Sequence, residues 1–402
     1  MIKETLKKAY VIFYKVIFNL FYIAIKSLKK HDNMKAVFVV SRENKLQGNL
    51  RYVQLELMEQ LPGVKIHFVH AENKMNLKLF KELITFSNAR YLILDDYYLP
   101  VYLIKPDRKM KVIQLWHAAG AFKKFGLSTV GTKFGPKLSY LKLIPIHSNY
   151  THVYVSSENV VPFYADAFNM PVSKIFALGI PRIDMFSNEE LTSKAKSALY
   201  TKYPELNDDN NINILIAPTY RAAGVQEESN FSMAKMLMEV VPFLNSNVRV
   251  LFRPHPYTDK HDLSRLHSCE NVVIANNYSL NEWMLVADAF ITDYSSAIFD
   301  FSLLKKPFAH FVPDFDHYEK NRGFYQDIKD ITDGELIQRT SDLVSWINYR
   351  TKEEYFNTTR MVNYNFSNTK DVTKKVVSHF LEKDSSLTKD LGGVQSGRVS
   401  NR

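Results

Sequence analysis

The chain has 402 residues, 46% of them apolar, a formal net charge of +10 and a single cysteine, Cys269. This apolar content is ample for folded cores and excludes disorder as the general state. One cysteine excludes an internal disulfide and a cysteine-cluster metal site. The composition therefore favours an intracellular globular protein, and the length favours two domains.

The positive charge is concentrated at the N-terminus. Residues 1–30 contain seven lysines and one acidic residue, Glu4, which gives this segment +6 and leaves +4 of the total +10 for the rest of the chain. A nucleic-acid-binding protein usually carries its basic residues on a folded domain with a recognisable motif. We therefore expect an anionic membrane surface as a partner, and no nucleic acid.

Residues 10–25 form the apolar part of this segment. Lys15 and Asn19 interrupt it, it is shorter than the roughly 20 residues that a membrane span needs, and no small-residue cleavage site follows it. On a helical projection one stripe holds Lys8, Lys15, Asn19, Tyr22, Lys26 and Lys30. We expect residues 1–32 to form an amphipathic helix on a membrane surface, with its lysines towards the headgroups. The alternative is an apolar helix that packs on the protein's own core and leaves its lysines in solvent.

Two series of apolar runs of strand length alternate with helical patterns. The first series covers 34–41, 64–71, 91–96, 111–117 and 152–157, with helices at 49–61 and 76–88. The second covers 211–219, 247–255, 271–276, 289–293 and 307–314, with helices at 231–245 and 279–287. This alternation predicts an α/β protein with two Rossmann-like parallel sheets and a cleft between them. We expect domains at 33–180 and 181–383, and a flexible tail at 384–402.

Motifs for common cofactors are absent from the sequence. There is no G-x-G-x-x-G after a strand, no G-x-x-x-x-G-K-[ST] and no H-E-x-x-H. The tripeptide Asp314-Phe315-Asp316 is of the kind that holds a divalent ion, but three residues are a weak signal and we expect a structural role. We expect neither a metal nor a cofactor.

Polar groups stand just past the ends of three predicted strands: His117, His255 and the pair Ser295–Ser296. In open α/β sheets, ligands bind beyond the carboxyl ends of the strands. Serine is a favoured helix N-cap, and the free backbone N–H groups of a helix start attract anions. Capping alone needs one serine, so the pair favours a diphosphate ligand. We expect Asp293 to order the turn through hydrogen bonds.

His117 is the candidate general base, because histidine is the commonest base near neutral pH. The small residues 118–120 would let a substrate approach closely, and Lys123 and Lys124 are placed to meet phosphate. The alternative is a packed histidine at a strand end.

His255 is flanked by two prolines and preceded at one remove by Arg253. The fixed φ of proline can aim the imidazole into the cleft. A partly buried histidine in a surface turn is an equally supported interpretation.

Six motifs occur in order along the chain: LWHAAGAFKKFG (115–126), LGIPRID (178–184), PTYR (218–221), RPHP (253–256), TDYSSAIFDFSLLKKP (292–307) and VPDFDHYEKNRGFYQD (312–327). Together they resemble the CDP-glycerol glycerophosphotransferase family, which builds teichoic acids in Gram-positive bacteria. One departure is the Ala-Ala-Gly at 118–120, where the family more often has Gly-Thr-Pro. The histidine before it and the lysines after it remain.

The resemblance implies a GT-B-like fold and a peripheral location at the cytoplasmic face of the cell membrane. It implies transfer of glycerol phosphate or ribitol phosphate from CDP-glycerol or CDP-ribitol to an undecaprenyl-diphosphate-linked saccharide acceptor, with release of CMP. His117 matches the family's catalytic histidine, and His255 matches a second essential histidine near the diphosphate. The expected donor phosphate-binding residues are Ser295, Ser296, Arg322 and Arg253; Thr219, Arg221 and Asp293 would line the donor site, and Lys123 and Lys124 would contact an acceptor phosphate.

Two other functions stay open. A GT-B glycosyltransferase that uses a nucleotide sugar for a cell-surface polysaccharide would share the fold and the cleft. A non-catalytic, membrane-docked assembly module would not need the intact set of histidines and serines. The sequence leaves open whether the donor is glycerol- or ribitol-based, whether one unit or many are added, and the oligomeric state.

Overall fold

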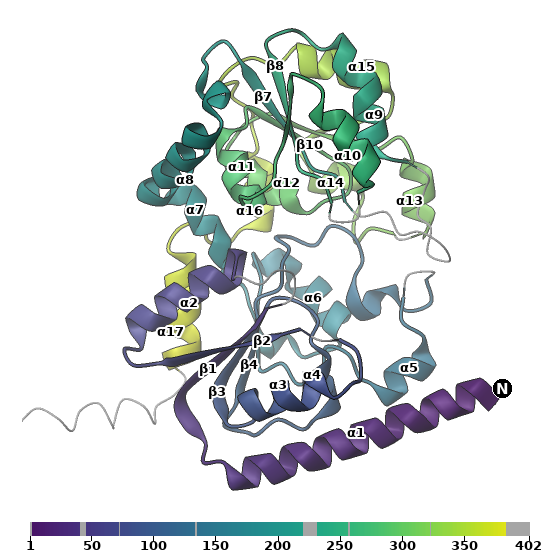
Figure 1. Ribbon diagram of the computed structural model, residues 1–402, viewed down its shortest axis with the longest axis vertical. Coiled ribbons are helices and arrows are strands. Elements are labelled where there is room, and N and C mark those ends of the chain that lie inside the picture. The colour runs from purple at the N-terminus through teal and green to yellow at the C-terminus, as the bar shows by residue number, and fades with distance from the viewer. Residues whose placement is uncertain are drawn as a thin grey trace, which may run out of the picture.

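The computed structural model describes residues 2–40, 46–71, 73–132, 135–219, 231–255, 258–321 and 323–382. They form two parallel six-stranded sheets with helices packed around each, one above the other in Figure 1. The expected α/β architecture is confirmed. Every expected strand is present, with bounds that shift by a few residues.

The first sheet has the strand order β2-β1-β3-β4-β5-β6. Its strands are β1 (Asp32–Val40), β2 (Lys65–His70), β3 (Ala89–Leu94), β4 (Lys111–Gln114), β5 (His152–Tyr154) and β6 (Ile175–Phe176). Ala36 and Phe38 of β1 share a core with α2 (Gly48–Gln60) and α17 (Val372–Glu382). Val37 and Val39 point to the other face, towards α3 (Lys78–Phe86) and α4 (Leu99–Leu103). Both faces are buried, which is why the strands are nearly continuous apolar runs.

The second sheet has the order β12-β11-β10-β7-β8-β9. Its strands are β7 (Ile212–Ile216), β8 (Val248–Phe252), β9 (Val272–Ile274), β10 (Ala289–Thr292), β11 (Phe308–Phe311) and β12 (Glu335–Ile337). One face packs with α9 (Met233–Val240) and α15 (Thr340–Asn348), the other with α11 (Leu280–Val286) and α12 (Ala297–Ser302). The chain builds outward from β7 to β9 and then returns to the other side of β7 as β10. The boundary between β7 and β10 is therefore the topological switch point of this sheet.

The other elements connect these layers. They are α5 (Leu138–Leu143), α6 (Val161–Phe168), α7 (Asp184–Ser187), α8 (Glu189–Lys202), α10 (Lys260–His267), α13 (Phe315–Asn321), α14 (Ile328–Ile331) and α16 (Thr359–Asn365), with 3-10 turns η1 (Gly126–Thr129), η2 (Glu158–Val160), η3 (Val172–Lys174), η4 (Pro181–Ile183), η5 (Pro204–Asn207) and η7 (Val241–Phe243). The chain crosses between the sheets through η4, α7 and α8. In η4, Arg182 donates from Nε to Asp300 Oδ2 of α12 at 2.7 Å, and both side chains are largely buried. This ion pair joins the crossing to the second sheet.

The C-terminal helix α17 returns to the first sheet. It packs on α2, and the Asp184 carboxylate accepts hydrogen bonds from the backbone N–H groups of Val372 and Thr373. The structure therefore places residues 372–382 on the first sheet. The sequence-based boundary assigned them to the second domain, because they follow its last strand along the chain.

The N-terminal helix α1 (Ile2–Leu28) lies along the outside of the first sheet's helix layer (Figure 1). Val11, Tyr14, Phe18 and Tyr22 form a buried stripe in the same core as α3 and α4. By length and composition alone, Glu4–Leu28 is long and apolar enough to cross a membrane, which residues 10–25 by themselves did not indicate.

Part of the polar stripe of α1 contacts the protein. Lys15 Nζ donates to the Leu143 carbonyl at 2.9 Å, Lys26 pairs with Asp107 at 2.6 Å, and Asn19 Oδ1 accepts from the backbone N–H of Lys105 at 3.2 Å. The expectation that the lysine stripe faces headgroups or solvent is therefore wrong for Lys15, because this part of the stripe borders the buried one; the side chains of Lys8 and Lys26 are 48% and 41% exposed, and Lys30 is exposed as well. The outward face is apolar instead: Leu6, Tyr10, Ile12, Phe13, Val16, Ile17, Leu20 and Ile23 are exposed.

Candidate active site

His117 lies at the carboxyl edge of the first sheet, three residues past the end of β4. Its Nδ1 is 3.0 Å from the backbone oxygen of Asp95 and 3.9 Å from Asp96 Oδ1, both just past the end of neighbouring β3. A carbonyl oxygen only accepts, so Nδ1 carries the proton and Nε2 is the nitrogen that can take one up. The side chain is 33% exposed. The arrangement suits a general base oriented by its neighbours.

The residue before this histidine is held in a rare backbone conformation. Trp116 has φ 52, in the left-handed region that a bulky residue seldom adopts. Its N–H donates to Gln114 Oε1 at 2.8 Å, and its carbonyl accepts from Asn49 Nδ2 at 2.8 Å. Its indole stacks on the imidazole of His117 with ring centroids 4.5 Å apart. Strain of this kind persists where the surrounding contacts over-determine it, and here it fixes the direction of His117.

The loop after His117 reaches the second sheet. Gly120 has φ 65, and a Cβ there would lie 2.7 Å from the Phe299 ring of α12 and 2.7 Å from Asn365 Oδ1. Its N–H donates to Ser156 Oγ at 2.9 Å. We expected the small residues 118–120 to admit a substrate; in the structure Ala119 and Gly120 are buried, and Gly120 permits close packing against α12.

Lys123 and Lys124 lie beside the segment that follows residue 322. Lys123 forms an antiparallel bridge with Phe324, and the Lys124 N–H donates to the Gly323 carbonyl at 3.2 Å. The Tyr325 N–H donates back to Phe122 at 3.2 Å. Arg322, the expected phosphate-contacting arginine, lies outside the described residues. Its neighbours nevertheless place the second-sheet loop against the lysines that follow His117.

At the switch point of the second sheet, Asp293 holds two chain segments together. Its Oδ1 accepts from the N–H of Thr219 at 2.8 Å, just past β7, and from the N–H of Tyr294 at 2.7 Å. Only 1% of Asp293 is exposed. The expected ordering of the turn by this carboxylate is confirmed. Thr219, a candidate for lining the donor site, is thus fixed beside the serine turn, whereas Arg221 lies outside the described residues.

Ser295 and Ser296 follow this turn and are partly exposed. Ser295 Oγ accepts from the N–H of Ala297 at 3.2 Å, which is a local cap. Ser296 occupies the N-cap position of α12 but makes no side-chain capping bond. The hydroxyl of Ser295 thus caps the backbone, and within the described residues the hydroxyl of Ser296 makes no capping bond.

His310 of β11 supports the turn from behind. Its Nδ1 is 2.7 Å from the Asp293 carbonyl and its Nε2 is 3.0 Å from Thr332 Oγ1. Complete burial lowers the pKa of His310 to about 4, so its ring is neutral at pH 7. The sequence indicated no role for this residue, because a histidine inside an apolar run resembles any core position.

Arg253 and His255 lie past the end of β8. Arg253 Nη1 donates to the Ala275 carbonyl at 2.7 Å, at the end of adjacent β9. His255 is partly exposed, and its carbonyl accepts from the N–H of Thr258 at 2.8 Å. At least one N–H group of Arg253 therefore joins the ends of β8 and β9. The phosphate-binding roles of Arg253 and His255 remain predictions.

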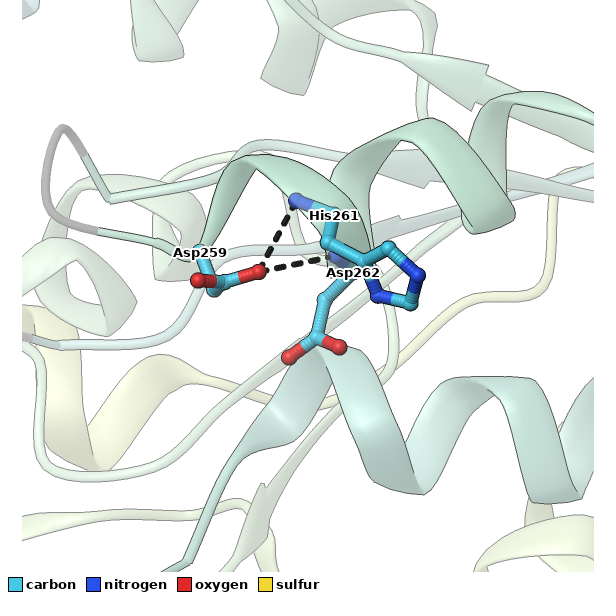
Figure 2. A group of neighbouring side chains, drawn as sticks. All are labelled: Asp259, His261 and Asp262. Atoms are coloured by element: carbon cyan, nitrogen blue, oxygen red, sulfur yellow. Dashed lines mark hydrogen bonds between the residues drawn. The ribbon is translucent and has the colours of Figure 1, made fainter.

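Close to His255 in the sequence, three possible metal ligands gather at the start of α10: Asp259, His261 and Asp262 (Figure 2). Their candidate ligand atoms lie within 4.8 Å of one another. Asp259 Oδ1 already accepts from the backbone N–H groups of His261 at 2.8 Å and Asp262 at 3.2 Å, so it caps the helix. Capping explains this group.

In the tripeptide Asp314-Phe315-Asp316, Asp314 Oδ1 accepts from the Tyr294 hydroxyl at 2.9 Å, in line with the expected structural role.

Two residues that contact His117 Nδ1 were missed in the sequence. Asp95 and Asp96 follow β3, which pairs with the strand that leads to His117. The Asp96 carboxylate after an apolar run is a readable signal, since the ends of adjacent parallel strands share one edge, whereas the Asp95 contact is made by a backbone carbonyl and has no residue signature. The strand order needed to place them beside His117 was not available from the sequence.

A model of the family described as CDP-glycerol:poly(glycerophosphate) glycerophosphotransferase matches residues 21–380. The chain is 35% identical over 341 residues to the teichoic acid ribitol-phosphate primase of Bacillus spizizenii, covering 82% of this chain and 86% of that protein. It is 33% identical over 353 residues to the teichoic acid poly(ribitol-phosphate) polymerase of the same organism, covering 85% of this chain and 54% of that protein.

Among solved structures, the wall teichoic acid polymerase TagF is similar, with a TM-score of 0.73 at 19% identity, covering 97% of this chain and 98% of that one. This likeness confirms the expected GT-B-like fold. The extent of the family match and the identity to the primase together show that the chain belongs to the CDP-glycerol:poly(glycerophosphate) glycerophosphotransferase family.

Proposed function

We propose that this chain transfers an alditol phosphate from a CDP-alditol to a hydroxyl group of a lipid-linked acceptor in teichoic acid biosynthesis, and releases CMP. Family membership supports the reaction class. The observation that carries the proposal is the orientation of His117 at one sheet edge, with Gly120 of the same loop packed against α12, the helix that opens after the serine turn of the other sheet.

In the proposed reaction the acceptor hydroxyl attacks the β-phosphorus of the CDP-alditol. A new phosphorus–oxygen bond forms there, and the bond from that phosphorus to the bridging oxygen of the diphosphate breaks, so CMP leaves. The hydroxyl proton passes to His117 Nε2. The Asp95 carbonyl and the Asp96 carboxylate, at 3.0 and 3.9 Å from Nδ1, stabilise the imidazolium that results. Such transfers depend mainly on positioning and on neutralising phosphate charge.

We assign the donor diphosphate to the edge of the second sheet. Ligands of open α/β sheets bind at the topological switch point, and Ser296 and Thr219 stand on its two sides. The partly exposed His255 and the segment around Arg322 complete the proposed donor site. Lys123 and Lys124, fixed against residues 323–325, supply positive charge between the two substrates.

Ribitol is the alditol that the comparisons favour. The primase and the polymerase compared above are both ribitol-phosphate enzymes by name, and they are 35% and 33% identical to this chain. We therefore propose CDP-ribitol as the preferred donor and CDP-glycerol as the weaker one.

We further propose a peripheral location at the cytoplasmic face of the cell membrane, with α1 as the attachment. The outward face of α1 is apolar along its length, and single-chain proteins rarely expose contiguous apolar surface without a partner. The opposite face is committed to the protein through the buried stripe and through Lys15. A helix held lengthwise in this way suits insertion into the membrane interface.

A donor panel tests the function. Purified full-length protein is incubated with a polyprenyl-diphosphate-linked saccharide acceptor and, separately, with CDP-ribitol, CDP-glycerol and UDP-sugars, and released CMP or UDP is measured. We expect CMP from CDP-ribitol, less from CDP-glycerol, and no UDP. UDP release would instead favour a sugar transferase, and no release from any donor would favour a non-catalytic module. Sizing the lipid-linked product then separates a primase from a polymerase.

A further inference from the structure

A cavity of ≈ 390 Å³ lies in the first domain, away from the residues assigned above. It is bordered by η1, α5 and the end of α6, and its lining is mixed: apolar side chains such as Leu141, Ile146 and Met170 stand beside polar ones such as Ser148, Asn169 and Lys174. Its volume is in the range of about 300–1,000 Å³ that is usual for ligand pockets. None of the catalytic steps proposed above uses it.

The inner wall of this cavity adjoins Trp116 and, through it, His117. His147 and Phe168 line the cavity, and their rings lie 5.7 and 5.2 Å from the Trp116 ring. Trp116 in turn stacks on His117 at 4.5 Å. Burial lowers the pKa of His147 to about 3, so this wall is uncharged at neutral pH. Two successive contacts between buried or half-buried rings therefore connect the wall of the cavity to the proposed base.

The outer side of the cavity adjoins the exposed apolar surface. Leu138 of α5 and Val172 of η3 are exposed close in sequence to lining residues. In Figure 1, α5 lies beside the N-terminal half of α1, and Lys15 of α1 donates to the last carbonyl of α5. Lys174 lines the cavity and is exposed. The exposed apolar surface of α1 and α5 thus adjoins a cavity that carries an exposed cation, Lys174, in its lining.

We propose that this cavity holds the part of the acceptor's hydrocarbon chain next to its diphosphate, with Lys174 contacting the diphosphate. This inference rests on the proposed lipid-linked acceptor. An amphiphile entering from a membrane needs apolar walls that continue the membrane-facing surface and a cation where its headgroup emerges. The cavity provides apolar side chains and an exposed cation, and the rings of His147, Phe168 and Trp116 connect its inner wall to His117.

Photolabelling tests the site directly. Full-length protein in phosphatidylglycerol vesicles is irradiated with a polyprenyl diphosphate that carries a diazirine in the isoprene unit next to the diphosphate, and labelled peptides are mapped. We expect labelling within 141–150 and 168–174. Labelling confined to α1, or equal labelling of the cavity by a phosphatidylglycerol with an acyl-chain diazirine, would overturn the proposal. This readout does not depend on turnover.

Kinetics supply a second test with a matched control. Leu141→Trp narrows the cavity, whereas Leu55→Trp adds the same indole at an exposed position of α2. We expect Leu141→Trp to raise the KM for a long-chain acceptor by roughly tenfold, because the acceptor then buries one to two fewer methylene groups in the cavity. The KM for the CDP-alditol and the KM for a short-chain acceptor should stay unchanged. An equal effect on both acceptors, or none on either, would refute the site. Absence of CMP release by the wild type would instead refute the proposed function.

Discussion

The replacement Asp96→Asn tests how the proposed base is oriented and activated. Asparagine keeps the size of the side chain, and its oxygen can still accept from the N–H of Tyr97, which lies 2.7 Å from Asp96 Oδ1. At the 3.9 Å that separates Oδ1 from His117 Nδ1, a carboxylate attracts an imidazolium by about 1 kcal/mol in water and by about 4 kcal/mol at an effective dielectric constant near 20. The two side chains are 24% and 33% exposed. We therefore expect a loss on the order of 1–2 kcal/mol, which is roughly a tenfold fall in kcat.

The assay is CMP release as a function of pH. Without the carboxylate, the imidazolium of His117 is less stable, so the neutral base persists to lower pH. The acidic limb of the profile should move to lower pH while kcat falls and the KM for the CDP-alditol stays constant. Glu158→Gln, at an exposed acid of the same domain, is the control. A normal kcat with an unmoved acidic limb would refute the role given to Asp96.

Three further outcomes follow from the contacts. Gly120→Ala places a methyl group 2.7 Å from the Phe299 ring at φ 65 and should lower the free energy of unfolding by about 2–4 kcal/mol, measured by urea denaturation; unchanged stability would contradict the packing. His310 is neutral when folded, with a pKa of about 4, and binds protons more readily when unfolded, so its contribution to stability is present above pH 6.5 and declines as the pH falls towards 4. Lowering the pH from 8 to 5 should therefore reduce the free energy of unfolding by about 2 kcal/mol less in His310→Gln than in the wild type. Ser296→Ala should raise the KM for the CDP-alditol by about tenfold, because it removes a hydrogen bond to a charged group. Ser295→Ala should mainly remove a helix cap and lower stability. Equal KM values in both variants would contradict the assignment.

The layered architecture was readable from the sequence because each buried strand is a continuous apolar run between helical patterns. Strand order was not, since a run such as 89–94 does not show which strands flank it. The return of α17 was likewise invisible, because it depends on contacts of Asp184 with residues nearly two hundred positions later. β6 and β12, with two and three residues, are too short to give a periodic pattern.

Parts of the site followed from residue chemistry and parts from packing. His117 and the serine turn were singled out because both follow predicted strands and both lie in motifs of the family, and their roles remain predictions. The orientation of α1 was predicted wrongly for Lys15, which looks like a solvent-facing residue, because its partner Leu143 is distant in the sequence. A helical projection shows which side chains share a stripe, but only tertiary contacts decide which stripe faces the protein.

The most direct test of the central claim is the rate of CMP release by His117→Ala under single-turnover conditions, with enzyme in excess over the acceptor and CDP-ribitol saturating. His70→Ala, at an exposed histidine of β2, is the matched control. Loss of a general base should lower the rate by roughly 10²- to 10⁴-fold, while the dissociation constant for CDP-ribitol stays within about twofold of the wild-type value. CMP release by His117→Ala at the rate of the control would contradict the assignment of His117 as the base.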